Sequence, residues 1–351
     1  MEKKAGIEDF ITTLIREGGS DLHLAAGRKP AIRVSGDLLF LVNQDEISSD
    51  QMVDFLNTLL GNDRYESFLK KKEFDFSYSF NGSRLRGNAF FQRGLACLSL
   101  RLIPKSKPIS ELHLPTILEN FSRRKQGFFL VVGPVGQGKS TTLSSMVDLI
   151  NQERTAHIVT IEDPIEFIYE PNKSIIDQRE VGIDTDDFPV ALKAALREDV
   201  NVLLIGEMRD PETISAAVTA AETGHLVFST LHTNNASQTI DRIIDSFPQG
   251  QQDQIRIQLA ASLIGIFSQR LIPRIAGGRV PAYELLINNN AVSNLIRERR
   301  THEIDIVIET SFEQGMIDMN RSLIELVQQG EISMDTAYQY SFNPKALEQL
   351  M

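Results

Sequence analysis

Eight residues that begin at Gly133 have the types and spacing of a phosphate-binding loop. The segment GPVGQGKS fits the pattern G-x-x-x-x-G-K-S. Glycines let the backbone wrap so that successive N–H groups face phosphate oxygens, the lysine reaches the β- and γ-phosphates, and the serine hydroxyl ligates Mg²⁺. The predicted ATP-binding residues are Gly133, Pro134, Val135, Gly136, Gln137, Gly138, Lys139, Ser140 and Thr141, with Ser140 also a predicted Mg²⁺ ligand.

Three carboxylates follow the next apolar run, in the segment Thr160-Ile-Glu162-Asp163-Pro-Ile-Glu166. The carboxyl ends of strands in a doubly wound sheet line the ligand crevice, and a carboxylate there can act as general base toward the attacking water. The same pattern would arise in a solvated acidic turn. The residues alone do not choose between Glu162 and Glu166.

A third apolar run, Val202-Leu-Leu-Ile, ends in Gly206-Glu207-Met-Arg209-Asp210. An acid at this position of a P-loop protein holds the metal or its waters, which makes Glu207 a candidate metal ligand and catalytic residue. Gly206 stands where an aspartate is more common. A purely structural role for Glu207 is the alternative.

Two histidines bracket a fourth apolar run. Seven extended residues span up to about 23 Å, so His225 and His232 cannot both touch one phosphate unless the chain bends. His232 lies on the nucleotide side of the run. Ordinary hydrogen-bonded histidines are the alternative, and a metal site is disfavoured because no third ligand is near in sequence.

The first hundred residues contribute the arginines Arg84, Arg86, Arg93 and Arg101. Arginines on a small domain usually form a solvated face. A sharper hypothesis is that one or two reach the γ-phosphate of a neighbouring subunit in trans.

The elements that position these residues fall into two patterns. Before residue 104 a helical opening and short alternating runs such as Phe74–Phe80 predict a small α+β domain. From about residue 125, buried apolar runs alternate with helical patterns and predict a parallel sheet covered on both faces. We predict domains at 1–103 and 116–290, a Pro- and Lys-containing linker at 104–115, and a helical region at 291–351.

Composition limits the possibilities further. The net charge of -11 disfavours nucleic acid as a partner, and the single cysteine excludes an intrachain disulfide framework and a four-cysteine zinc site, which suggests a cytoplasmic protein. No apolar run reaches the roughly 18 residues of a membrane span. The longest near the C-terminal half, Ile257 to Gln269, is interpreted as a buried helix, so no membrane insertion is expected.

Beyond these inferences, the chain resembles type IV pilus retraction ATPases of the PilT/PilU family, within the secretion ATPase superfamily. The matching segments are GPVGQGKSTTL, TIEDPIEF, QREVGIDTDDFPVALKAALRED, GEMRDPETI, AAETGHLVFSTLHTNNASQTIDRIID and GSDLHLAAGRKPAIRVSG. The resemblance implies a PAS-like domain, a RecA-like α/β domain with C-terminal helices, and a hexameric motor for pilus retraction and twitching motility. It also implies an inner-membrane platform protein as partner, so that the motor is held at that membrane from the cytoplasmic side.

The same resemblance implies particular roles for site residues. It places the catalytic glutamate at Glu166, the Walker-B glutamate at Glu207 and a histidine pair at His225 and His232. The arginines Arg86, Arg93 and Arg101 remain candidates for action in trans. Two segments depart from the PilT pattern: AIRNLI reads AVSNLI, with Ser293 in place of arginine, and FNQNR reads Phe90-Phe-Gln-Arg-Gly94, which is closer to PilU.

Several alternative functions follow. The chain could be an accessory, PilU-like ATPase that depends on a paralogous motor, or an assembly or secretion ATPase. Those ATPases usually carry further N-terminal domains and a four-cysteine zinc module. A RecA-like nucleic-acid translocase is disfavoured by the acidic balance. A regulator that binds ATP without hydrolysis is disfavoured by intact Lys139, Glu166 and Glu207.

Overall fold

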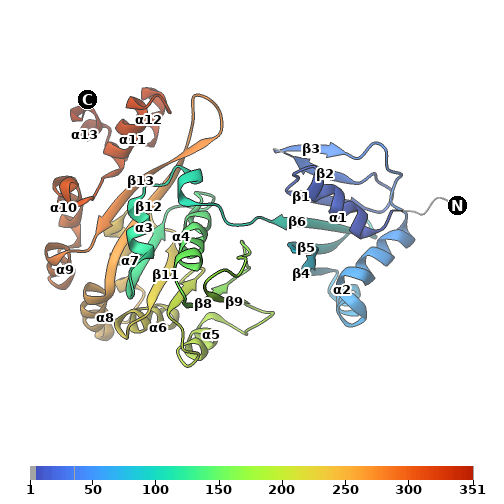
Figure 1. Ribbon diagram of the computed structural model, residues 1–351, viewed down its shortest axis with the longest axis horizontal. Helices are drawn as coiled ribbons and strands as arrows, with labels where there is room; N and C mark the ends of the chain where they lie inside the picture. Colours follow the sequence, from blue (N-terminus) through green and yellow to red (C-terminus); the bar gives the residue numbers. More distant parts are fainter. Residues whose placement is uncertain (1–4, 35, 351) are drawn as a thin grey trace. The chain divides into compact units, whose positions relative to one another are not determined.

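The computed structural model describes residues 5–34 and 36–350, and the chain divides into two compact units, residues 1–105 and 106–351 (Figure 1). The domains predicted at 1–103 and 291–351 include residues 1–4, 35 and 351, which lie outside the described residues. Among the described residues, none of the helices combines the length and apolar character needed to cross a bilayer.

The first unit is an antiparallel sheet with two helices. Its described strands are ordered β3-β2-β1-β6-β5-β4. Apolar residues such as Leu22, Leu24, Leu98 and Leu100 alternate along the strands and so lie on one face of the sheet, which packs against the buried faces of the helices. The elements are α1 (Ile7–Arg16), β1 (Asp21–Ala25), β2 (Ala31–Val34), β3 (Asp37–Phe40), α2 (Ser49–Lys71), β4 (Glu73–Phe80), β5 (Ser83–Gln92) and β6 (Leu95–Ile103).

The second unit contains a larger sheet, whose described strands are ordered β13-β12-β7-β11-β10-β8-β9. All neighbouring pairs from β9 to β12 are parallel, and β13 is antiparallel to β12. The strands are β7 (Gly127–Val132), β8 (His157–Glu162), β9 (Ile175–Glu180), β10 (Val202–Ile205), β11 (Leu226–Leu231), β12 (Leu263–Pro273) and β13 (Arg279–Ile287). The predicted α/β class with a parallel sheet is confirmed.

Helices cover both faces of this sheet (Figure 1). Successive residues of β7 show why: Phe128 and Leu130 pack into the core beneath α5–α8, whereas Phe129 and Val131 pack into the core beneath α3 and α4. A strand buried on both faces reads as a continuous apolar run. The helices are α3 (Ile117–Ser122), α4 (Lys139–Glu153), α5 (Phe188–Ala195), α6 (Pro211–Glu222), α7 (Ala236–Asp245) and α8 (Gln249–Ser262).

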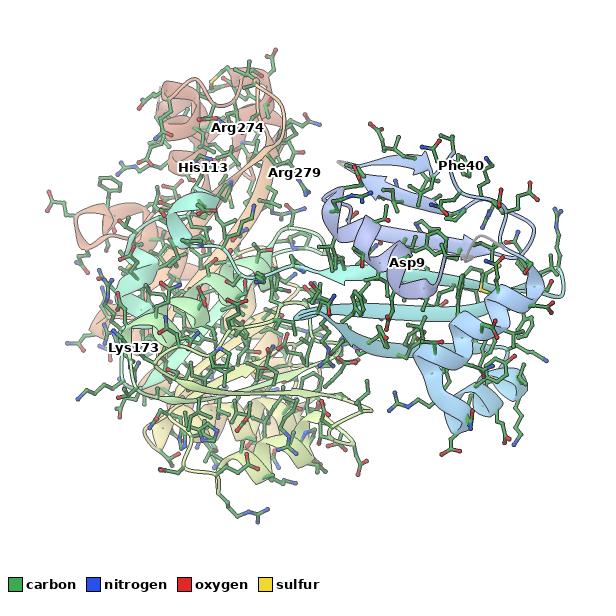
Figure 2. The ribbon with its side chains drawn as sticks, turned by 45° about the vertical axis from the view of Figure 1, so that its right-hand side comes forward. Asp9, Phe40, His113, Lys173, Arg274 and Arg279 are labelled. Carbon is green, nitrogen blue, oxygen red and sulfur yellow. The ribbon has the colours of Figure 1, made fainter. Side chains whose placement is uncertain are left out.

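The C-terminal region of the second unit is helical. It packs partly against the far ends of β12 and β13, where Ile272 and Val280 share a core with Leu323. The elements are α9 (Asn290–Arg297), α10 (Ile304–Thr310), α11 (Met319–Gln328), α12 (Met334–Tyr340) and α13 (Pro344–Gln349), with 3₁₀ turns at Ile109–Leu112, Thr301–Glu303 and Phe312–Gln314. Figure 2 labels Arg274 and Arg279, which flank the turn between β12 and β13.

Two segments differ from the sequence interpretation. The run from Ile257 to Gln269 is not one helix: α8 ends at Ser262 and β12 begins at Leu263, because the helical backbone stops where the chain enters the sheet beside β7. Most of the range 104–115, expected as a linker, belongs to the second unit. There Ile109 and Leu114 are buried, and Ser145 Oγ on α4 donates to the Lys107 carbonyl at 2.6 Å.

Candidate nucleotide-binding site

The loop between β7 and α4 is shaped by glycines. Gly136 and Gly138 have φ of 77° and 79°, in the left-handed region, and Gly138 is the N-cap of α4. A Cβ on Gly133 would lie 2.5 Å from the Gln269 carbonyl oxygen, so only glycine fits there. The loop therefore leads into the N-terminus of a 15-residue helix. The free N–H groups and dipole of that terminus favour a bound phosphate.

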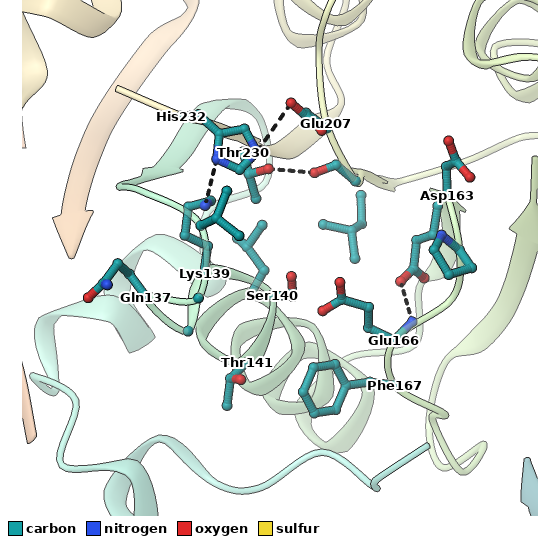
Figure 3. Close-up of a pocket in the computed structure, with 18 of the residues that line it drawn as sticks. Gln137, Lys139, Ser140, Thr141, Asp163, Glu166, Phe167, Glu207, Thr230 and His232 are labelled. Atoms are coloured by element: carbon teal, nitrogen blue, oxygen red, sulfur yellow. Dashed lines mark hydrogen bonds and ion pairs between the residues drawn. The ribbon is translucent and has the colours of Figure 1, made fainter. Parts of the chain in front are cut away.

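Lys139 lies at the start of α4 and is held by the loop itself. Its ammonium group donates to the carbonyl oxygens of Gly133 and Pro134, both at 2.9 Å, and contacts His232 Nδ1 at 3.2 Å (Figure 3). Burial lowers the pKa of Lys139, while the charges of Glu207 and Glu166 oppose that effect. A buried cation that feels the charges of two carboxylates suits the charge of a triphosphate.

His232 joins Lys139 to Glu207. Its Nδ1 accepts from the lysine, so its Nε2–H faces Glu207 Oε1 at 3.2 Å. Arg209 donates to Glu207 Oε2 at 2.8 and 2.9 Å. Burial acts to raise the pKa of Glu207, but the hydrogen bond from Arg209 and the charges of His232, Arg209 and Lys139 outweigh it and lower that pKa. Glu207 is therefore an ionised carboxylate beside the phosphate loop.

The two candidate bases, Glu162 and Glu166, have different surroundings. Glu162 is buried at the end of β8, accepts from Thr160 Oγ1 at 2.7 Å, and accepts from the Glu166 backbone N–H at 3.3 Å (Figure 3). Burial raises its pKa to about 7. Glu166 is exposed, and its side chain lines the same cavity as Lys139. Geometry thus gives Glu162 the features of a support and leaves the Glu166 carboxylate available to the cavity.

These side chains surround one cavity of about 430 Å³. It brings together residues from the ends of β7, β8, β10 and β11, as expected for a doubly wound sheet. The predicted residues that line it are Val135, Gly136, Gln137, Gly138, Lys139, Ser140, Thr141, Glu166, Glu207 and His232, and the alternative base Glu162 lines it as well. Gly133 and Pro134 contribute through their carbonyl bonds to Lys139.

His225 does not join this group within the chain. It precedes β11 at the end opposite to His232, and its Nδ1 lies 2.9 Å from the Ala220 carbonyl oxygen. β11 runs from Leu226 to Leu231 between the two histidines without the bend that would be needed to bring them together. An extended strand therefore separates the two histidines within one chain, as their spacing predicted, and the catalytic role of His225 stays a prediction.

The arginines of the first unit lie on its sheet. Arg86 is on β5 opposite Arg101 on β6, and Arg101 Nε lies 2.8 Å from Asp21 Oδ1 on β1. Arg93 occupies the β5–β6 turn with φ of 51°. Arg86, Arg93 and Arg101 are exposed.

Sequence reasoning missed several residues at this site. Thr230 Oγ1 donates to the Gly206 carbonyl at 2.6 Å and thereby joins the ends of β11 and β10. Arg279 lines the cavity from the start of β13, and Gln269 contacts the loop from β12. The position of Thr230 near the carboxyl end of an apolar run could have identified it as a site residue. Gln269 lay in a run interpreted as helix, so no signal identified it.

Mg²⁺ fits the donor set of this cavity. The Ser140 hydroxyl and the Glu207 carboxylate both line it and are hard oxygen donors of the kind that Mg²⁺ prefers. Among the described residues there is no cluster of three or more His, Cys, Asp or Glu side chains that could hold a metal by itself. A metal here would therefore share its coordination with phosphate oxygens and water.

The fold and the loop define a P-loop nucleotide-binding protein. The family model "Type II/IV secretion system protein" matches residues 96–339. The chain is 43% identical to the type IV pilus retraction ATPase PilT of Pseudomonas aeruginosa, covering 94% of this chain and 96% of that one. It is 39% identical to the type IV pilus ATPase PilU of the same organism, covering 94% and 87%.

A solved structure described as the pilus retraction motor PilT with bound ADP is also similar to this chain. The TM-score is 0.91, with 45% identity, 99% of this chain covered and 100% of the other. The chain belongs to the type II/IV secretion system protein family and is a P-loop ATPase of that family.

Proposed function

We propose that this ATPase hydrolyses Mg·ATP at the cavity around Lys139 to drive retraction of a type IV pilus. The observation that carries the proposal is the convergence of Lys139, Glu166 and Glu207 on one cavity behind a glycine-shaped loop. The loop N–H groups and Lys139 bind the phosphates, and Ser140 and Glu207 hold the metal. The similarity to PilT supplies pilus retraction as the use of that energy.

Within this proposal, Glu166 orients and deprotonates the attacking water. Its side chain reaches the cavity, and its own backbone N–H is anchored on Glu162. His232 keeps Glu207 and Lys139 in register through its two ring nitrogens. In a homohexamer, one or more of Arg86, Arg93 and Arg101 of a neighbouring subunit supplies positive charge that stabilises the γ-phosphate during hydrolysis.

A motor of this kind has further expected partners. We propose that the ring works in the cytoplasm against an inner-membrane platform protein of the pilus machine, and without nucleic acid. Deleting the gene and scoring surface pili tests the direction of the work. Retraction predicts an excess of pili and loss of twitching motility, restored by the native chain and not by Lys139→Ala. Bald cells would instead indicate an assembly ATPase.

A second candidate is an accessory retraction ATPase that depends on a paralogous motor. It is favoured by the PilU-like segment Phe90-Phe-Gln-Arg-Gly94 and by Ser293, where the PilT pattern has arginine. Ser293 Oγ hydrogen-bonds the Ala260 carbonyl at 3.0 Å and thereby ties α9 to α8. Retraction by this chain in cells that lack every other retraction ATPase would reject the accessory role.

A further inference from the structure

Gln269 is a polar residue buried in β12, with 2% of its surface exposed. Both ends of its amide bind elements of the phosphate loop region. The Nε2 group donates to the carbonyl oxygen of Gln137 at 2.8 Å, and Oε1 accepts from Thr142 Oγ1 on α4 at 2.6 Å. A buried amide with both ends satisfied is a rigid spacer, because loss of either bond leaves a buried polar group without a partner.

Two residues of β12 bind Gln137 of the loop. The backbone N–H of Leu271 donates to the Gln137 side-chain oxygen at 2.7 Å, and the Gln269 side chain donates to the Gln137 main-chain oxygen, so both parts of Gln137 are held. A Cβ on Gly138 would lie 3.0 Å from Gln269 Nε2. The last glycine of the loop is therefore packed against this amide.

The bond to the Gln137 carbonyl fixes the direction of one peptide group. In a planar trans peptide the C=O and the following N–H point in opposite directions. With the Gln137 oxygen held toward β12, the Gly138 N–H must point away from β12. Glycine at 138, and at 136 on the other side of Gln137, tolerates several backbone conformations, so this peptide has little intrinsic resistance to a flip. A flipped peptide would turn a carbonyl oxygen toward a phosphate.

We infer that Gln269 is a positioning residue for phosphate recognition: it holds the Gln137–Gly138 peptide so that the N–H faces the anion. It touches neither nucleotide nor metal and acts through the loop. The inference rests on the proposed nucleotide site. It adds that a residue of β12 contributes to the preference of that site for a diphosphate or triphosphate. The Gln137 carbonyl and the hydroxyl of Thr142 are the two groups through which it acts.

The test is calorimetric binding of ADP and AMP to the full-length chain and to Gln269→Met, which has similar volume but no amide. We expect the Kd for ADP to rise about tenfold, the size of one lost hydrogen bond at a charged ligand, and the Kd for AMP to change less than about twofold. The KM for ATP should rise by the same factor with kcat within about twofold, because the lost contact serves ground and transition state alike.

Asn288→Asp is the matched control. Asn288 is an amide whose Nδ2 donates to the carbonyls of Ala260 and Leu263 near the start of β12, away from the loop. The control should lower the melting temperature and leave the ADP affinity unchanged. Thr142→Val keeps the bond between Gln269 and the Gln137 carbonyl, so its loss of ADP affinity should be smaller than that of Gln269→Met.

Equal losses of ADP and AMP affinity in Gln269→Met, or native ADP affinity, would overturn the inference. If Gln269→Met does not fold, Gln269→Glu retains the oxygen that accepts from Thr142 and lacks the donor to Gln137. It should then lose ADP affinity more than Thr142→Val does, and the reverse order would also overturn the inference. Absence of ADP binding by the native chain would instead reject the nucleotide site itself.

Discussion

The two sheets of this protein distribute charged residues in different ways. In the second unit the strands from β9 to β12 are parallel, so the loops after their carboxyl ends gather Lys139, Glu207 and His232 around one cavity. In the first unit the strands alternate in direction, and charged residues meet as cross-strand neighbours such as Arg86 and Arg101. Parallel topology concentrates chemistry at one edge, whereas antiparallel topology spreads charge over a face.

This contrast gives the second unit a cavity at one sheet edge and the first unit a face of charged side chains. Directly opposed like charges destabilise a sheet, and Asp21 compensates the charge of Arg101 in the opposed pair Arg86 and Arg101. An anionic ligand would relieve that repulsion. The arginine face of the first unit is therefore suited to a neighbouring subunit's triphosphate, as proposed above.

The largest expected effect comes from removing the first unit. A chain beginning at Ser106, which keeps the segment packed on α4, should bind ATP but lose about 10³–10⁵ in kcat, the contribution of an arginine supplied in trans. Steady-state ATPase measurements on a variant with native circular dichroism test this. In the full chain, Arg86→Ala should lower kcat more than Arg101→Ala does, because Arg101 is already paired with Asp21. Arg16→Ala is the control. Full activity of the shortened chain would remove the first unit from catalysis.

The next effect separates the two glutamates. Glu166→Gln should keep ATP affinity and lower kcat by about 10²–10⁴-fold, the usual contribution of a general base. Glu162→Gln should lower kcat less than about tenfold, since a glutamine oxygen can still accept from the Glu166 N–H. Single-turnover hydrolysis with bound ATP measures both. The reverse order would assign the base to Glu162.

A smaller effect contrasts the two ends of β11. His232→Gln breaks the link between Lys139 and Glu207 and should lower kcat/KM by about 10–100-fold, the effect of leaving charged groups without a partner. His225→Gln removes a bond to the Ala220 carbonyl and a longer contact with Thr223 Oγ1, and kcat/KM should stay within about twofold of the native value. Equal losses in the purified protein would indicate that His225 acts at the site of another subunit.

Stability should depend on pH through the buried Glu284. Burial raises its pKa to about 8, far above its unfolded value, so the folded chain holds a proton there that the unfolded chain releases. The stabilisation by this proton is complete below the ordinary pKa of 4.5 and is lost progressively as the pH rises from there to about 8. Glu284→Gln keeps an acceptor for the Ala236 N–H and should raise the melting temperature by a few degrees more at pH 8 than at pH 5.5. An equal shift at both pH values would contradict this.

The smallest expected effect is from nucleic acid. Single- or double-stranded DNA at physiological salt should leave the ATPase rate of the native chain unchanged, because the chain carries a net charge of -11. A several-fold stimulation that falls as salt rises would favour a translocase over a pilus motor.

Much of the site followed from the sequence because local physics determined it. The loop at 133–140 has a fixed spacing set by phosphate geometry, and strand ends in an alternating α/β pattern point to one edge of a sheet. Lys139, Glu207 and His232 were identified on that basis, whereas Glu166 was preferred to Glu162 only through the family resemblance. The structure brings all four predicted residues to one cavity. Their catalytic roles stay predictions.

Only the tertiary structure decided which residues support this site. Gln269 and Arg279 lie more than a hundred residues after the loop and reach it because β12 pairs with β7 and β13 with β12. The start of β12 looked helical because α8 runs into it without a break, and an apolar period cannot separate a buried strand from a buried helix. The environments that raise the pKa of Glu162 and Glu284 likewise arise from burial, which depends on long-range packing.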